Sequence, residues 1–151
     1  MTTPTALDAL SNALAPLRTH PWAYPVLEAL HILGIALLIG NLVLLEFRVW
    51  GRASALPVRQ LAHLALSIAL AGFALAATTG LLMFASQSSE LLANRAFTLK
   101  LLLLFLAGCN AAWFHARDSL AKLDALAKAQ TMFSTLLWLA VIACGRAIAY
   151  I

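Results

Sequence analysis

Charged residues are scarce in this chain. Asp, Glu, Lys and Arg make up 11% of its 151 residues, whereas 63% are hydrophobic. A water-soluble domain carries about 25% charged residues, so this composition and a mean hydropathy of +0.90 exclude one. No basic face is large enough to hold a duplex, so the basic pI does not indicate nucleic-acid binding. We expect an integral membrane protein that contacts the lipid bilayer.

Sulfur ligands are also scarce, because the chain has two cysteines and three methionines. Cys109 and Cys144 form no CxxC motif, so neither a disulfide nor a thiolate metal site is predicted. No methionine-rich tract is present to hold soft Cu(I). The first residues lack the basic segment of a signal peptide and include Asp8 before any apolar run, which predicts that no leader is cleaved there.

Four apolar stretches each have about the ~20 residues needed to cross ~30 Å of hydrocarbon. They lack the alternation of a β-barrel, so the predicted fold class is all-α, a four-helix membrane bundle forming one domain over residues 1–151. A short N-terminal amphipathic helix is expected to start at Thr3 and Pro4 and to lie on the membrane, because leucines recur there at helical spacing. The expected spans are residues 22–47, 58–85, 96–116 and 132–148.

Lysine and arginine positions predict the orientation of the bundle. The first and third connections are basic, whereas the opposite side has only Arg18 and Arg95 in its loops and tail. By the positive-inside rule, the basic connections face the cytoplasm and both termini face the periplasm of a bacterial inner membrane. The residues that make the two connections basic are Arg48, Arg52, Arg59, Arg117, Lys122 and Lys128.

Ionisable residues inside the spans are the strongest functional signal. Each costs about 2.5–3.5 kcal/mol to insert, so such residues pair with one another or mark function. Glu28, His31, Lys100 and Arg146 are all expected in the outer half of the bundle. A Glu28–Arg146 ion pair with Lys100 reaching to the surface is the simplest structural explanation, but it leaves His31 unexplained.

A polar chamber for a flat molecule is the alternative. Gly34 and Asn41 share a helix face with His31, and Ala107 shares one with Lys100. Four-helix membrane bundles hold haem with inward histidines, because neutral imidazole ligates iron and nearby cations stabilise the propionates. His31 is thus the leading axial ligand. No second histidine lies at its depth, which leaves five-coordinate haem, ligation by Lys100 or no haem.

Three further patterns leave alternatives open. His63 and His115, near the inner ends of their spans, either hold a second haem b or face lipid head groups. Zinc or copper bound by His20, Glu28 and His31 is a minor alternative. A stripe of small residues permits close packing against a helix of the same chain or of another protomer. The stripe comprises Ala62, Ala65, Ala69, Gly72, Ala76 and Gly80.

Three segments carry a resemblance to known families: "PWAYPVLEALHILGIALLIGNLVLLEFRVWG", "FTLKLLLLFLAGCNAAWFH" and "STLLWLAVIACGRAIAY". Together they resemble small uncharacterised four-helix proteins of bacterial inner membranes. More distantly, "ALHILGIALLIG" and "LKLLLL" resemble HemJ, the membrane protoporphyrinogen oxidase, and "LWLAVIACGRAIAY" resembles CopD-type copper-resistance proteins. The HemJ resemblance implies haem b, with His31 and Lys100 at family positions. Asn110 stands where HemJ proteins tend to carry a histidine, which weakens transfer of the oxidase activity more than of haem binding.

The sequence therefore predicts a haem b-binding inner-membrane protein that takes part in electron transfer, in the manner of a cytochrome b. Lys100, Asn110 and Arg146 would line the pocket or meet the propionates, and Glu28 would balance charge. If the chain is an enzyme, it is expected to be a haem-dependent oxidoreductase whose partner is a redox protein or a quinone. The alternatives are a non-enzymatic subunit of a homo-oligomer or larger membrane complex, and a copper-transport component.

Overall fold

The computed structural model describes residues 6–52 and 54–150, and within these ranges the chain forms helices and no strands. Four helices are long and apolar enough to cross a membrane, which confirms the all-α four-helix fold. They are α3 (Ala23–Val49), α4 (Val58–Ser86), α6 (Arg95–Ala116) and α8 (Ala125–Ala147). Short helices join or precede them, namely α1 (Ala6–Ala13), α2 (Ala15–Thr19), α5 (Ser88–Ala93) and α7 (Ser119–Lys122).

Local sequence sets several of the helix ends. The Asn94 side-chain oxygen accepts hydrogen bonds from the backbone N–H groups of Ala96 and Phe97, at 2.9 and 3.1 Å, and so caps the start of α6. Pro57 has extended backbone directly before α4, where its missing N–H does no harm. Gly51 follows α3 with a φ of 88°, a conformation that glycine adopts without strain.

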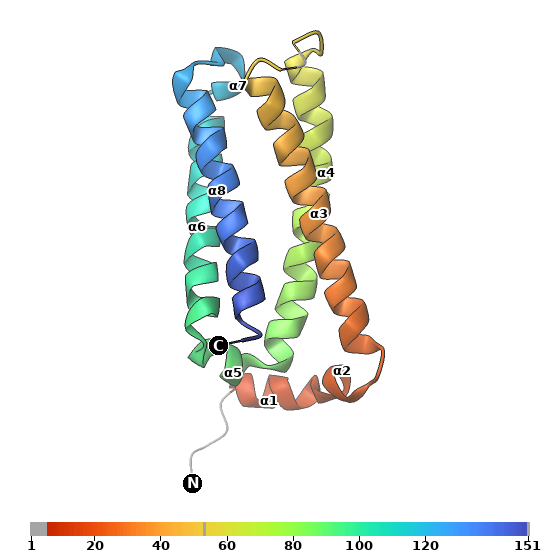
Figure 1. Ribbon diagram of the computed structural model, residues 1–151. Coiled ribbons are helices and arrows are strands. Elements are labelled where there is room, and N and C mark those ends of the chain that lie inside the picture. The colour runs from red at the N-terminus through yellow and green to blue at the C-terminus, as the bar shows by residue number, and fades with distance from the viewer. Residues whose placement is uncertain (1–5, 53, 151) are drawn as a thin grey trace.

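The spanning helices form two antiparallel hairpins, α3 with α4 and α6 with α8, which meet mainly through α3 and α8 (Figure 1). Within the first hairpin the backbones are in direct contact where Gly34 faces Gly72. A Cβ atom added at Gly34 would lie 2.7 Å from both the Gly72 oxygen and the Ala76 nitrogen. Small residues allow this approach, and close van der Waals packing is what holds helices together in lipid.

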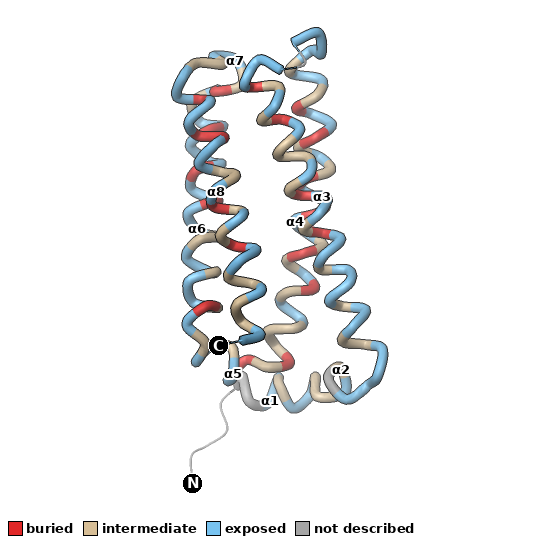
Figure 2. The backbone as a smooth tube through the Cα atoms, in the orientation of Figure 1, coloured by how far each residue is buried: buried red, intermediate tan, exposed pale blue. Residues whose placement is uncertain are grey.

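The stripe of small residues on α4 is therefore a packing face, and its neighbour is α3 of the same chain. Buried positions follow the inner faces of the helices, while the outward faces are exposed (Figure 2). Large apolar side chains such as Leu64, Leu70 and Phe105 lie on the outward faces, as expected for surfaces covered by lipid. The buried members of the stripe are Ala62, Ala65, Ala69, Gly72 and Ala76.

The N-terminal part of the chain lies across one end of the bundle as α1 and α2 (Figure 1). The Ser11 hydroxyl donates a hydrogen bond to the Ser86 carbonyl at 3.0 Å, which ties α1 to the end of α4. The short N-terminal helix predicted from the sequence is thus present, but in two pieces. Pro16, in the first turn of α2, lacks the N–H that a continuous helix would use. The expected start at Thr3 and Pro4 lies outside the described residues.

The fourth spanning helix begins earlier than predicted, at Ala125 instead of Met132. Asp124 caps this start, because its carboxylate accepts a hydrogen bond from the Ala127 N–H at 2.9 Å. The same carboxylate forms an ion pair with Arg117, which follows the end of α6. The expected boundary was wrong because the first turns of α8 are polar in sequence and are stabilised by contacts that only the folded chain provides.

Asp118 precedes α7 but makes no capping hydrogen bond with its side chain. Asp118 and Leu123 instead adopt left-handed backbone, with φ of 54° and 47°. These two residues bracket α7 and turn the chain from α6 into α8. Left-handed backbone is uncommon for leucine, so local propensity gave no sign of this turn.

We predict an acid-sensitive contribution from the Arg117–Asp124 pair. The hydrogen bond from Arg117 and that from the Ala127 N–H lower the pKa of Asp124 from its usual 3.8 to about 2, and Arg117 is held further in its charged form, its own pKa being raised. A depressed carboxyl pKa adds stability above pH 3.8 that is lost as the pH falls through about 2. In thermal unfolding in detergent at neutral pH, the midpoint temperature of wild type should be higher than that of Asp124→Asn. This difference in midpoint temperature should shrink as the pH falls from 3.8 to about 2. A difference independent of pH would contradict the prediction.

Both basic connections, between α3 and α4 and between α6 and α8, lie at one end of the bundle, here called the α7 end. The N-terminal helices, α5 and the end of α8 lie at the opposite end, here called the α5 end (Figure 1). This arrangement has the charge asymmetry that the orientation rule requires. It therefore supports a multi-pass membrane protein with one basic end.

Candidate functional site

A polar layer lies between the hairpins towards the α5 end, and all four spanning helices contribute to it. His31 of α3 and Lys100 of α6 lie close enough to interact electrostatically. Gly80 of α4 lies beside His31, and Gly145 of α8 lies beside Lys100. We call these four residues, with Thr79, the histidine–lysine layer. The structure thus brings together His31 and Lys100, as their expected depths predicted.

The His31 side chain forms a hydrogen bond with Thr79 of α4. Its Nδ1 atom lies 3.0 Å from the hydroxyl oxygen of Thr79. That hydroxyl lies 2.8 Å from the Leu75 carbonyl and donates its one proton there. While the hydroxyl donates to Leu75, its oxygen can only accept from His31, and the ring proton is then on Nδ1. Nε2 then keeps its lone pair, which is the form of histidine that binds metals.

Two glycines give the polar side chains their space. A Cβ atom at Gly80 would lie 3.0 Å from His31 Cε1, so only glycine leaves the imidazole where it is. A Cβ atom at Gly145 would lie 3.5 Å from Lys100 Nζ, so the ammonium group rests on bare helix backbone. Cys144 also lies within electrostatic range of Lys100. The layer therefore sets the His31 imidazole near the half-buried Lys100 side chain.

Glu28 and Arg146 were expected in this layer, but no described hydrogen bond or ion pair joins either side chain to it. Both are exposed, and no ion pair joins them among the described side chains. Arg146 donates a hydrogen bond to the Tyr150 hydroxyl and stacks over that ring, with its Cζ 4.8 Å from the centroid. A cation–π contact satisfies a guanidinium at a membrane surface without a carboxylate. The proposed Glu28–Arg146 clip between helices is therefore wrong.

The chamber predicted beside Gly34 is also wrong. Gly34 is buried against the α4 backbone, so no space remains there for a flat molecule. Asn41, on the same predicted face, donates its amide to the Leu37 carbonyl of its own helix at 2.8 Å. The helical spacing identified a packed face correctly, but it could not distinguish packing against a helix from packing against a cofactor.

The side chains of His63 and His115 are not paired by any described contact. Both side chains are exposed, and no described hydrogen bond or ring contact joins them. The His115 ring packs edge-on against Phe114, with centroids 5.9 Å apart. The His63 carbonyl accepts a bond from the Ser67 hydroxyl at 2.7 Å. Their positions near the α7 end fit the alternative in which they face the membrane surface.

A second group of polar side chains gathers between α3, α6 and α8 towards the α7 end. The Thr135 hydroxyl donates a hydrogen bond to the Glu46 carboxylate. The Trp50 indole N–H donates to the Thr131 hydroxyl at 2.9 Å. Both bonds join α3 to α8 and so hold the two hairpins together. We call this group the α7-end cluster; it comprises Glu46, Asn110, Gln130, Thr131, Ser134 and Thr135.

Asn110 and Gln130 are the buried amides of this cluster. Asn110 donates its side-chain amide to the Gln130 backbone carbonyl at 3.1 Å, and Gln130 Oε1 accepts from the Ser119 hydroxyl at 2.9 Å. Asn110 therefore does not lie beside Lys100, as the predicted haem pocket required. The two residues are ten positions apart on one helix, a rise of about 15 Å. That length along α6 places Asn110 in a separate site.

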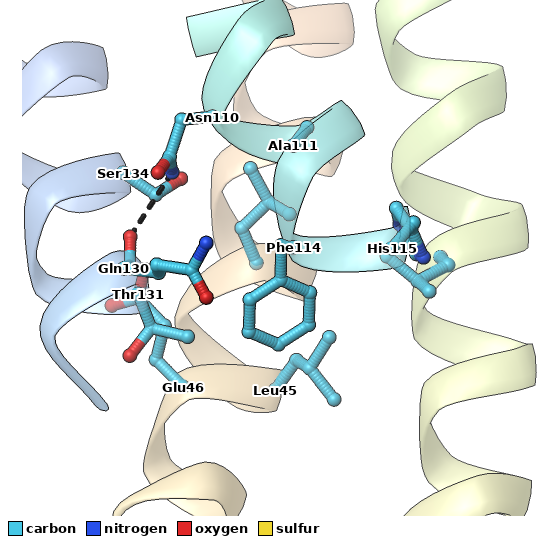
Figure 3. Close-up of a pocket in the computed structure, with 11 residues that line it drawn as sticks. Leu45, Glu46, Asn110, Ala111, Phe114, His115, Gln130, Thr131 and Ser134 are labelled. Atoms are coloured by element: carbon cyan, nitrogen blue, oxygen red, sulfur yellow. Dashed lines mark hydrogen bonds between the residues drawn. The ribbon is translucent and has the colours of Figure 1, made fainter. Parts of the chain in front are cut away.

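A cavity of about 90 Å³ opens beside the α7-end cluster. Glu46 and Leu45 reach it from α3, Asn110 and His115 from α6, and Gln130 from α8 (Figure 3). Gln130 is only 3% exposed, and its Nε2 atom has no hydrogen-bond partner among the described residues. Buried donors without a partner are rare in native proteins. This amide therefore marks the cavity as a place for a ligand.

Sequence reasoning missed most of this cluster for a positional reason. Glu46 precedes the expected end of its span at residue 47, where carboxylates commonly reach water. Gln130 and Thr131 fell before the expected start of the fourth span at residue 132. The shifted start of the fourth span thus left two polar residues, Gln130 and Thr131, outside the expected membrane segment. Recognising Asp124 as a helix cap, a signal present in the sequence, would have recovered Gln130 and Thr131.

Metal clusters of several side chains are absent from the described residues: no three His, Cys, Asp or Glu side chains converge. The minor zinc set of His20, Glu28 and His31 is not assembled, because the His20 ring accepts from the Trp22 N–H at 3.3 Å at the exposed start of α3. Cys109 and Cys144 are free thiols. Haem iron needs only one or two protein ligands, so its requirements are different.

The chain matches no family model, and comparisons with curated proteins and with solved structures gave no match. Its function must therefore be inferred from the chemistry of the two polar groups.

Proposed function

We propose that the chain binds haem b in the membrane through the histidine–lysine layer and takes part in electron transfer. His31 Nε2 would hold the iron, and Lys100 would meet an anionic propionate. Haem b, when bound, supplies one-electron chemistry at iron. The bilayer surrounds the protein, the basic α7 end faces the cytoplasm and both termini face the periplasm.

The contact between His31 Nδ1 and the Thr79 hydroxyl is the observation that carries this proposal. Haem-ligating and metal-ligating histidines use one ring nitrogen for the metal and donate the other N–H to a fixed acceptor, which orients the ring. Thr79 is that acceptor here, at 3.0 Å from Nδ1. Because Gly80 has no side chain, the His31 ring can occupy this position. An imidazole held by a hydroxyl that is itself anchored to its helix backbone fits an iron ligand.

Lys100 contributes a positive charge to the proposed haem site. A lysine in the membrane is costly to keep charged unless a partner offsets its charge, and the neighbours of Lys100, His31 and Cys144, supply no carboxylate. A haem propionate would offset that charge.

The first test is an absorption spectrum of the detergent-purified protein from haem-replete cells, oxidised and then reduced with dithionite. We expect a Soret band that shifts on reduction and a pyridine haemochrome of the b type. His31→Ala should abolish the bound haem because it removes the iron ligand. His63→Ala is the matched control, since that side chain is exposed at the other end of the bundle, and it should keep the full spectrum.

Two results would overturn the haem proposal. One is a colourless wild-type protein from haem-replete cells, and the other is an unchanged haem content in His31→Ala. In either case the polar layer would serve to register the helices, and a non-enzymatic membrane subunit would be the better description.

Thr79→Val supplies a finer prediction. Valine keeps the shape of threonine but removes the hydroxyl that accepts from His31 Nδ1. Loss of such an orienting partner weakens metal binding by about 10–100-fold, so haem should be retained at high occupancy and lost on dilution or titration with apomyoglobin. Thr78→Val is the control, because Thr78 is exposed and bonds only the Ala74 carbonyl, at 2.8 Å. Equal haem retention in the two variants would contradict the role of Thr79.

A further inference from the structure

The cavity beside the α7-end cluster is separate from the histidine–lysine layer, and nothing in the proposed function uses it. Its walls combine apolar side chains, such as Leu42, Leu66 and Phe114, with the polar side chains of the cluster. A volume of about 90 Å³ exceeds the ~30 Å³ that a water molecule occupies in the liquid. It falls well short of the ~300–1,000 Å³ typical of sites for drug-sized molecules.

Two polar groups on the cavity wall determine which hydrogen bonds an occupant must make. Gln130 Nε2 is a buried donor that lacks an acceptor, and Figure 3 shows its amide directed among the lining side chains. Glu46 is an acceptor, of which one carboxylate oxygen is engaged by the Thr135 hydroxyl. The occupant must therefore accept from Gln130 and donate to Glu46.

These requirements separate the classes of occupant. A metal cation would meet the carboxylate but would face the N–H of Gln130, and an anion would meet that N–H but would face Glu46. An acyl chain would leave both groups without hydrogen bonds, at the full desolvation cost of each. Water donates and accepts, fits the volume and finds the several polar partners that a buried water needs.

We propose that this cavity holds water that bridges Gln130 and Glu46, and that Glu46 is a proton-binding site in exchange with the solution at the α7 end. His115 lines the cavity and is exposed near the last turn of α6, so the route for exchange opens beside it. Each step moves one proton between a water molecule and the Glu46 carboxylate. No oxidant or further reactant is needed.

The titratable groups that face this site are few. Glu46 itself comes from α3 and His115 from α6. The lining residues of α8 are Gln130, Thr131 and Ser134, and that of α4 is Leu66, none of which titrates in the physiological range. Among the lining residues, the pH response of the cavity therefore belongs to Glu46, with His115 at its mouth.

Infrared spectroscopy of the protein in lipid nanodiscs tests the proton site. As the pH is lowered, a carboxylic-acid carbonyl band should appear that is separate in frequency from those of the other five Asp and Glu side chains, and this separate band should be missing in Glu46→Gln. Glutamine keeps the shape of the side chain and can still accept from Thr135, so the variant is expected to fold. Glu28→Gln is the matched control, because Glu28 is an exposed glutamate of the same helix, and it should keep the band. A band that survives in Glu46→Gln, or no titrating band in wild type, would overturn the proposal.

Nuclear Overhauser transfer to the side-chain amide of Gln130 tests the occupant. In ¹⁵N-labelled protein, the amide resonance that disappears in Gln130→Met should receive magnetisation from water. Transfer from lipid acyl protons in place of water would overturn the proposal. Both readouts are independent of haem, so a colourless protein would leave this test intact, and a failed test would leave the haem proposal intact.

Discussion

Gly34→Ala should separate the first two spanning helices and destabilise the protein by about 1–3 kcal/mol, the usual cost of overpacking. The new Cβ atom would lie 2.7 Å from two backbone atoms of α4. Backbone atoms cannot move aside as a flexible side chain can, so the whole helix must shift. Alanine favours helix by up to about 1 kcal/mol over glycine, which is too little to offset the lost packing along α3 and α4. Thermal unfolding in detergent, followed by circular dichroism, measures the change.

Gly40→Ala is the matched control for this prediction. Gly40 lies on the same helix, is exposed, and has no atom within 4 Å of the position where a Cβ would stand. We expect this variant to be as stable as wild type or slightly more stable, from helix propensity alone. Gly72→Ala should behave like Gly34→Ala, because its Cβ would meet the Gly34 oxygen at 2.7 Å. Equal stability of the Gly34 and Gly40 variants would disprove the close helix contact.

Phe114→Ala should lower stability by about 3 kcal/mol, near the low end for a buried phenylalanine. Phe114 is 8% exposed and packs with Val49 and Ala127, against which Leu120 and Leu123 also pack. This apolar cluster joins the end of α3, the end of α6 and the start of α8. Because it lies at the α7 end, water can reach it once it opens, so the hydrophobic effect adds to packing there. Reversible unfolding in mixed micelles gives the free-energy difference.

Phe105→Ala is the comparison that isolates the effect of burial. Phe105 lies on the same helix as Phe114 but is 67% exposed on the outward face. Its ring contacts lipid both in the folded bundle and when the helices separate, so its removal should change the free energy of unfolding little. If Phe105→Ala cost as much as Phe114→Ala, the outward face of α6 would be packed against another protein instead of lipid. That result would favour an assembly over an isolated bundle.

The site was only half predictable from the sequence. Depth along each helix follows from residue count, so His31 and Lys100 could be placed in one layer before any contact was known. Their partners could not be foreseen. Thr79 and Gly80 belong to a helix that the sequence marked only as a packing face, and which face of α4 meets His31 depends on how the Gly34–Gly72 contact fixes the two helices.

Glu46 and Gln130 show a second limit of prediction from the sequence. Each lies near a helix boundary, where a polar residue is as compatible with water as with the membrane. Whether Gln130 lies in a loop or inside the bundle depends on where α8 begins, and that start is fixed by the Asp124 cap and the pair with Arg117. The cap is local to α8, whereas the ion pair joins Asp124 to the residue that follows α6. Hydropathy averages along one segment and is blind to such contacts.

The sequence by itself determined that this chain spans a membrane with four helices, because only helices satisfy their own backbone hydrogen bonds in lipid and because hydropathy is a local property. It also determined that one end of the bundle is basic. The tertiary structure decided which polar residues meet, because lipid-facing and buried positions are equally apolar in a membrane protein. It separated Glu28 from Arg146, filled the space beside Gly34 with the backbone of α4 and gathered Glu46, Asn110 and Gln130 around one cavity. Those outcomes depend on close packing between helices, which composition and periodicity along one helix do not encode.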